Sequence, residues 1–206
     1  MTSAHRRPTV LALGVCLLTL ALSACGGSSD PAPAAAPLPP AHYRVPVEQL
    51  PTGWRVSNPG GDGYHTTFCG VDMEPVAAVD SARYRYSKGP VGPFLEQHIR
   101  SYAGNTAAEV IGAVQAALPE CREFDAAGDD NNPTVRFTVA PVKLSSAAAS
   151  GPDTVAWRQK PADGSGVVSD VVLTRRGTTA VLLVAYSLRD EPDRAALTAA
   201  LAAVPQ

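Results

Sequence analysis

The groups in this chain that are best suited to contact a ligand fall in two stretches of the sequence. Residues 81–88 alternate arginine with tyrosine, and a histidine and another arginine follow at positions 98 and 100. A tryptophan lies in a later stretch, residues 154–158. Polar and aromatic side chains of this kind line clefts, whereas the alternative is a solvated surface with the tyrosines packed inward. The candidate ligand-binding residues are Tyr84, Tyr86, His98, Arg100 and Trp157.

Sequence motifs of common enzymes do not occur in the chain. It has no Gly-x-Ser-x-Gly, His-Glu-x-x-His, Ser-x-x-Lys or Walker motif. His42, His65 and His98 have no second histidine or cysteine at the spacing of metal ligands. The acidic residues 125–133 do not have the glycine and glutamate spacing of a calcium-binding EF-hand loop. We therefore expect no enzyme activity, no catalytic residue, no metal site and no cofactor.

An apolar run near the N-terminus follows two basic residues, Arg6 and Arg7, and ends in small residues. The run is too short to span a bilayer, and its pattern predicts a signal peptide over residues 1–24. The residues that close it, Leu22-Ser23-Ala24-Cys25-Gly26, resemble the lipobox of bacterial lipoproteins. This resemblance implies that Cys25 is acylated, becomes the first residue of the mature protein and anchors it to the membrane. The alternative is an ordinary secretory signal in which Cys25 falls at the cleavage site.

The four cysteines separate by position. Cys16 leaves with the signal peptide and Cys25 carries lipid, so Cys69 and Cys121 remain as one pair in an oxidising compartment. We expect them to form a disulfide, which closes a loop of about 50 residues and stabilises the fold by about 4 kcal/mol on a chain-entropy estimate. A metal-binding or redox pair is the alternative, and the wide separation of the two cysteines argues against it.

The mature chain is mildly acidic. The leader contains two of the 17 lysines and arginines, so 15 remain against 19 acidic residues, a net charge of −4. This balance excludes nucleic acid as a partner, because phosphate contacts need concentrated positive charge. Residues 25–42 are rich in proline and alanine and predict a tether of polyproline character. Residues 43–206 have the length of a single domain.

Apolar periodicity predicts the elements of this domain. Residues 81–88 and 94–102 fit an antiparallel strand pair, residues 106–118 fit a helix capped by Thr106, and residues 45–54 fit a docking segment anchored by Leu50 and Trp54. The remaining expected elements are strands over residues 135–139 and 154–158, a hairpin over 167–186 with its turn at 175–177, and a helix from about residue 192. The fold class is α+β, with a twisted antiparallel sheet of about five to seven strands, two or more helices packed on it and one disulfide.

The order of these features resembles a known family. The similarity is to the PknH-like extracellular sensor family of actinobacterial kinases and lipoproteins, over roughly residues 50–204. The stretches that carry it are Leu50-Pro51-Thr52-Gly53-Trp54, the two cysteines, Val155-Ala156-Trp157-Arg158, Asp170-Val171-Val172-Leu173-Thr174-Arg175-Arg176-Gly177 and Pro192-Asp193. The resemblance implies a twisted sheet with helices around a ligand cleft. Members of the kinase branch have a second disulfide, and this chain has one cysteine pair.

Two functions are consistent with these observations. The first is a lipid-anchored lipoprotein on the extracytoplasmic face of the cell membrane, whose domain binds a small molecule, a lipid or a cell-wall fragment. The second is a docking module for another protein of the cell envelope, without a small-molecule ligand. A concave apolar pocket favours the first, and an exposed apolar patch favours the second.

Overall fold

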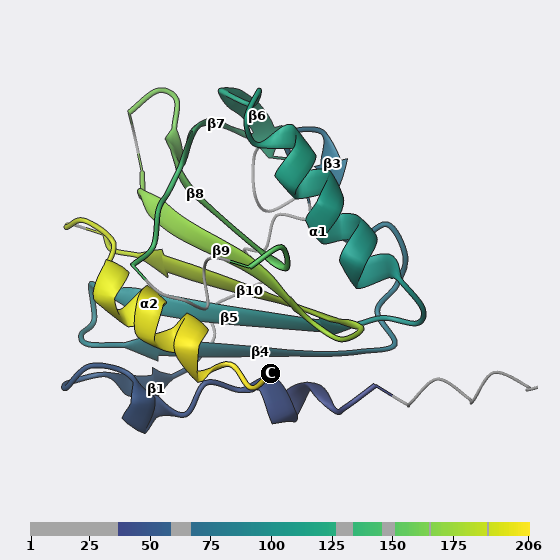
Figure 1. Cartoon of the computed structure of the whole chain (residues 1–206). Coiled ribbons are helices and arrows are strands. Elements are labelled where there is room, and N and C mark those ends of the chain that lie inside the picture. The colour runs from purple at the N-terminus through teal and green to yellow at the C-terminus, as the bar shows by residue number, and fades with distance from the viewer. Residues whose placement is uncertain (1–36, 59–66, 127–133, 146–150, 165, 189) are drawn as a thin grey trace, which may run out of the picture. The chain divides into compact units, whose positions relative to one another are not determined.

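The computed structural model describes residues 37–58, 67–126, 134–145, 151–164, 166–188 and 190–206. Figure 1 shows how their elements are arranged. The predicted signal peptide, Cys25 and most of the predicted tether lie outside the described residues. The elements are the 3₁₀ helices η1 (Pro40–Tyr43) and η2 (Val47–Gln49), the strands β1 (Arg55–Ser57), β2 (Thr67–Phe68), β3 (Val71–Asp72), β4 (Asp80–Ser87), β5 (Phe94–Ser101), β6 (Glu123–Ala126), β7 (Val135–Pro141), β8 (Thr154–Pro161), β9 (Ser169–Arg176) and β10 (Thr179–Tyr186), and the helices α1 (Thr106–Ala117) and α2 (Arg194–Ala203).

Eight strands form one antiparallel sheet in the order β1-β4-β5-β10-β9-β8-β7-β6, and β2 and β3 form a separate hairpin. The predicted antiparallel α+β class is confirmed, although the sheet has more strands than expected because the short strands β1 and β6 extend its two edges. β10 lies between β5 and β9, each of which pairs with it along all eight residues. Its nearly continuous apolar sequence fits this central position, since both of its faces are covered.

One face of the sheet, the α1 face, carries an aromatic core. Alternate residues of β8, β9 and β10 point to this face, and α1 covers them with the apolar stripe Ala107, Val110, Ile111 and Val114. Phe68, Phe124 and Trp157 pack in the same cluster, with the Phe68 and Trp157 rings 4.3 Å apart between centroids. α1 packs mainly on β3, β8, β9 and β10. The strands β4 and β5 therefore lie beyond the part of this face that α1 mainly covers.

The opposite face, the α2 face, carries a mainly aliphatic core. α2 buries Ala196, Leu197, Ala200 and Leu201 against it, as its periodicity predicted. The segment before β1 packs on the same face through Tyr43, Val45, Leu50 and Trp54, so the predicted docking role of Leu50 and Trp54 is confirmed. Pro40 is also buried, which places the start of the packed chain at η1, slightly before residue 43.

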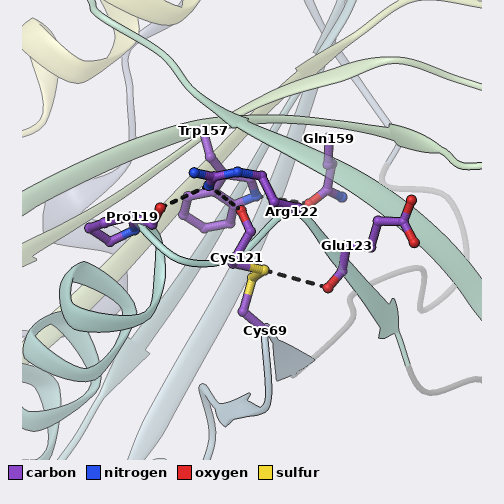
Figure 2. Close-up of a disulfide and its surroundings, with 7 residues drawn as sticks. All are labelled: Cys69, Pro119, Cys121, Arg122, Glu123, Trp157 and Gln159. Atoms are coloured by element: carbon purple, nitrogen blue, oxygen red, sulfur yellow. Dashed lines mark hydrogen bonds between the residues drawn. A yellow bond between two sulfur atoms is a disulfide. The ribbon is translucent and has the colours of Figure 1, made fainter.

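The Cys69–Cys121 disulfide forms as predicted, with Cα atoms 6.0 Å apart across a sequence separation of 52 residues. Figure 2 shows it directly after α1, where the Cys121 N–H donates to the Ala117 carbonyl at 3.1 Å. Cys69 and Gly70 are the two turn residues of the β2–β3 hairpin, with φ of 52° and 80°. Positive φ at both positions is the pattern of a type I′ turn. The disulfide therefore joins the end of α1 to the segment around Cys69, as the position of Cys121 after the helix predicted. The sequence did not predict that this segment is a hairpin.

Two local predictions were wrong. The N-cap of α1 is Asn105, whose side chain makes no capping hydrogen bond. Thr106 is the first helical residue and therefore does not cap the helix. The turn between β9 and β10 is Gly177 and Thr178, because Arg176 pairs with Thr179 and both arginines belong to β9. Gly177 has a φ of 58°, which suits the left-handed position of a two-residue turn.

Candidate functional site

The five residues that the sequence singled out lie on both faces of the sheet. Tyr86 is buried on the α2 face, where its hydroxyl donates to the Val45 carbonyl at 2.5 Å. Tyr84 is half-buried on the same face, 4.9 Å below the Arg44 guanidinium. Trp157 is buried in the core of the α1 face, and its indole N–H donates to Gln159 Oε1 at 2.9 Å. His98 and Arg100 lie side by side on β5. The structure therefore divides the five. His98 and Arg100 share the α1 face, Tyr84 and Tyr86 share the α2 face, and Trp157 lies in the aromatic core of the α1 face.

His98 belongs to a group of polar side chains that is centred on Glu96. The members of this group come from β4, β5 and β10, and the register of these strands places them on one face of the sheet. Arg85 lies opposite Glu96, and Arg83 lies opposite His98. We call this group the Glu96 cluster. It consists of Arg83, Arg85, Glu96, His98 and Tyr186.

Glu96 is contacted from four directions. Arg83 Nη2 lies 2.7 Å from Oε2, and His98 Nε2 lies 3.3 Å from the same oxygen. The Tyr186 hydroxyl donates to Oε1 at 2.8 Å, and Arg85 Nε lies 3.5 Å from Oε1. The Arg85 guanidinium also stacks 4.2 Å above the Phe94 ring. The side chains of Arg83 and Arg85 are 19% and 20% exposed, so both side chains reach the surface, whereas the Glu96 side chain is 10% exposed.

The electrostatics of the cluster fix one charge state at neutral pH. Burial would raise the pKa of Glu96, but the hydrogen bonds from His98, Arg83 and Tyr186 outweigh it and lower this pKa to about 2. Burial lowers the pKa of His98 even though Glu96 acts in the opposite direction. Burial and the charge of Glu96 together raise the pKa of Tyr186 to about 12. Glu96 is therefore ionised, while His98 and Tyr186 are neutral donors to it.

A second ion pair extends the cluster along the sheet. The Arg100 guanidinium pairs with Glu74, which lies in the link between β3 and β4. Arg100 and Glu74 are 20% and 27% exposed at their side chains. The surface over β4 and β5 thus presents three arginines in a row, each held in place by a carboxylate.

This arrangement is suited to binding rather than to proton transfer. A carboxylate with a pKa of about 2 is a weak proton acceptor at neutral pH, and efficient general bases have a pKa near the working pH. Within the described residues, no group of three or more His, Cys, Asp or Glu side chains has the geometry of a metal site. Guanidinium groups of partly exposed side chains that a carboxylate orients have a set geometry, which favours contact with an anionic or polar ligand.

The sequence did not single out Glu96, Arg83, Arg85 or Tyr186 as site residues. For three of them the expected strand bounds give the wrong register. A hairpin of residues 81–88 and 94–102 around a turn at residues 89–93 pairs residue 88 with residue 94, which puts Gln97 opposite Arg85. The observed register pairs Ser87 with Phe94 and puts Glu96 there, so the opposite-charge pair across the two strands became visible only in the structure. Tyr186 could not be identified either, since its contact depends on the pairing of β10 with β5.

The similarity of this chain to known proteins is low. No protein family model matches the chain, and no curated protein matches it. Among solved structures, the chain is similar to the extracellular domain of PknH from Mycobacterium tuberculosis, with a TM-score of 0.42 and 15% identity. The match covers 59% of this chain and 60% of that one.

No helix among the described residues is long and apolar enough to cross a membrane. The lipid anchor predicted at Cys25 falls outside the described part of the chain and stays a prediction.

Proposed function

We propose that this chain is a non-enzymatic binding domain, held on the extracytoplasmic face of the membrane by a lipid anchor at Cys25. The basic leader, the apolar run and the lipobox-like residues 22–26 support export and acylation. The Cys69–Cys121 disulfide is consistent with an oxidising compartment. The ligand is a small molecule, a lipid or a cell-wall fragment with an anionic group, and that group contacts Arg83 and Arg85.

The observation that carries this proposal is the way in which Glu96 holds the two arginines. Arg83 and Arg85 are two residues apart on β4, so their side chains leave the same face about 7 Å apart. Each is oriented by Glu96, and each still has about a fifth of its side chain exposed. A pair of oriented guanidinium groups loses less side-chain entropy on binding an anion than free surface arginines do.

Native mass spectrometry of the purified chain, exposed to an extract of the cell envelope, tests the ligand. We expect a stoichiometric added mass on the wild-type chain and none on the variant Arg83→Gln/Arg85→Gln. The matched control is Arg55→Gln/Arg136→Gln, which removes two arginines that are exposed elsewhere on the domain. If all three proteins stay at their bare mass, the proposal is wrong and the docking function becomes the better explanation.

The anchor has its own test. Cys25→Ala should move the protein from the detergent-soluble membrane fraction to the aqueous fraction, because the acyl chains would be absent. Metabolic labelling with a palmitate analogue should label the wild-type chain and not the variant. An unchanged distribution of the variant would contradict the lipoprotein prediction without affecting the binding test.

A further inference from the structure

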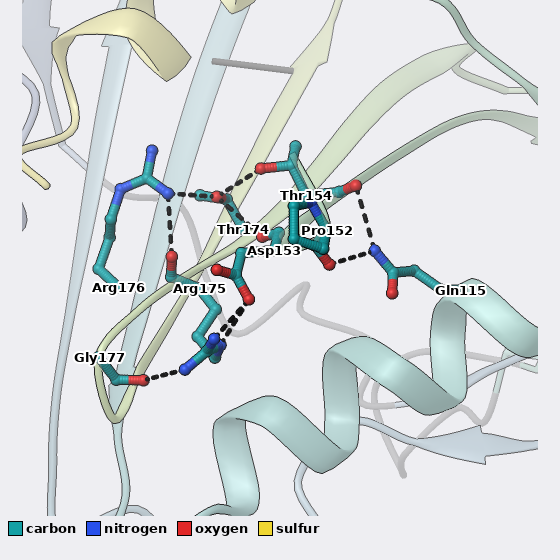
Figure 3. Close-up of polar contacts among 8 residues, drawn as sticks. All are labelled: Gln115, Pro152, Asp153, Thr154, Thr174, Arg175, Arg176 and Gly177. Atoms are coloured by element: carbon teal, nitrogen blue, oxygen red, sulfur yellow. Dashed lines mark hydrogen bonds and ion pairs between the residues drawn. The ribbon is translucent and has the colours of Figure 1, made fainter. Parts of the chain in front are cut away.

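The most unusual charged group outside the Glu96 cluster is Arg176, at the end of β9. Arg176 is 7% exposed, and no carboxylate of the described residues is in direct contact with it. Nε donates to the Pro205 carbonyl at 3.1 Å, and Nη1 donates to Thr174 Oγ1 and to the Arg175 carbonyl, both at 2.9 Å. Nη2 is buried and has no hydrogen-bond partner. Figure 3 shows this guanidinium beside the Thr174 hydroxyl.

The nearest carboxylate is committed to another residue. Asp153 pairs with Arg175, whose Nε and Nη2 lie 2.8 and 2.6 Å from Oδ1 (Figure 3). Burial lowers the pKa of the Arg176 guanidinium, and the charge of Asp153, which acts without a direct contact, raises this pKa by less. A buried cation that is bonded only to neutral oxygens carries a large desolvation penalty. Arg176 is therefore a buried positive charge without a directly bonded counterion among the described residues.

Hydroxyl groups lie next to Arg176 on the same face of the sheet. Arg176 pairs with Thr179 across β9 and β10, and Thr179 pairs with Ser101 across β10 and β5. Ser101 Oγ and Thr179 Oγ1 lie 3.0 Å apart, and both residues are fully buried. This contact uses one of the two hydroxyl hydrogens, so the pair retains a second donor. Arg176, Thr179 and Ser101 thus combine one guanidinium group and one spare hydroxyl donor in a buried environment.

We propose that Arg176 Nη2, with the Ser101–Thr179 hydroxyl pair, binds a small inorganic anion of about the size of chloride. The anion would supply the missing counterion and accept the unused N–H and O–H hydrogens. A small ion fits better than the anionic end of a larger ligand, because Ser101, Thr174 and Thr179 are all 0% exposed. Pro205 and Gln206 follow the buried Val204 after α2, and Arg176 holds Pro205 through its carbonyl. Local movement of this segment would admit the ion.

Thermal unfolding of the purified full chain in chloride and in gluconate at equal ionic strength tests the site. We expect the wild-type Tm to be higher in chloride by about 3 °C, because an ion that binds only the folded state stabilises it. Arg176→Met should abolish this difference. The matched control Arg136→Gln, at an exposed arginine, should retain it. An equal Tm of the wild-type chain in the two salts overturns the proposal.

A second measurement remains decisive if Arg176→Met does not fold. Crystals of the wild-type chain grown in bromide should show an anomalous peak within hydrogen-bond distance of Arg176 Nη2. A water molecule at that position, or no density there, overturns the proposal. The result is independent of the proposed ligand at Arg83 and Arg85, because those residues lie on the α1 face and Arg176 lies on the α2 face with Thr174 and Thr179.

Discussion

The two helices are fastened to opposite faces of the sheet in different ways. The C-terminal end of α1 is fastened covalently, because the Cys69–Cys121 bond follows directly after it. The N-terminal end of α2 is fastened by charge. Asp170 on β9 is fully buried and accepts hydrogen bonds from Arg158 on β8 and Arg194 on α2, at distances of 2.7 to 3.1 Å.

This difference helps to separate structural charges from functional ones. The Asp170 ion pairs join α2 to two strands, so they have an evident role in the fold. The Glu96 cluster has a similar composition, with one carboxylate and two arginines, but its members all come from the paired strands β4, β5 and β10. Those strands are already joined by their backbone ladders. Because the cluster connects no separate element, the fold does not need it to fasten one, and this is the reason to look for its role in binding.

The largest effect on stability is expected where the Asp170 pairs are broken. Arg158→Ala/Arg194→Ala leaves a fully buried carboxylate without a partner, which should lower the free energy of unfolding by about 3 to 5 kcal/mol. Urea denaturation measures it. The single variant Arg194→Ala is the control. Its side chain is 47% exposed and Arg158 remains in place, so it should lose about 1 kcal/mol or less. A loss below 1 kcal/mol in the double variant would show that the pairs do not fasten α2.

Removing the disulfide should have a somewhat smaller effect. Cys69→Ser/Cys121→Ser is expected to lower the free energy of unfolding by about 2 to 4 kcal/mol, because the unfolded chain gains freedom while the apolar stripe of α1 remains packed. Wild-type protein in reducing agent should reach the same value in urea denaturation. Reducing agent should not change the stability of the double serine variant. Titration of two free thiols in the native, unreduced protein would contradict the bridge.

The sequence was sufficient to predict the longer elements, in which the pattern of side chains repeats over eight or more residues. The paired strands over residues 81–88 and 94–102, the central run around residues 181–184 and both helices were confirmed. The elements that it missed are short. β1, β2 and β3 have two or three residues each, and a period of two cannot be distinguished over that length. Their pairing is decided by tertiary contacts such as the disulfide.

The candidate site was harder to predict than the fold. The sequence identified His98 and Arg100 correctly as neighbours, but it grouped them with tyrosines whose side chains point to the other face. That error arises because a strand sends alternate residues to opposite faces, so adjacent residues such as Tyr84 and Arg85 cannot serve one site. Cross-strand pairing decides which residues meet, and it becomes known only when the register is fixed.

Glu96→Gln should be less destabilising than loss of the Asp170 pairs, and its effect should depend on pH. At pH 6 we expect a loss of about 2 kcal/mol in the free energy of unfolding, because charged hydrogen bonds from three partners are weakened. The folded pKa of Glu96 is about 2, below its usual value of 4.5, so the stability that it contributes is present above pH 4.5 and is lost as the pH falls toward 2. The difference between wild type and variant should therefore be at least halved at pH 3. A difference that is constant between pH 6 and pH 3 would contradict the lowered pKa.

The smallest effect on stability is expected for Arg83→Gln/Arg85→Gln, about 1 kcal/mol. Unlike Asp170 in the first variant, Glu96 would keep two hydrogen-bond donors, His98 and Tyr186, and the glutamines can still donate hydrogen bonds. In this variant the pKa of Glu96 should rise from about 2 toward the usual value, and NMR titration of the Glu96 carboxyl carbon can follow this rise. This variant distinguishes the two clusters most directly. If it unfolds as readily as Arg158→Ala/Arg194→Ala, the Glu96 cluster is a structural device like the Asp170 pairs. If the variant remains folded and does not bind the ligand, the role of the partly exposed Arg83 and Arg85 is to bind that ligand.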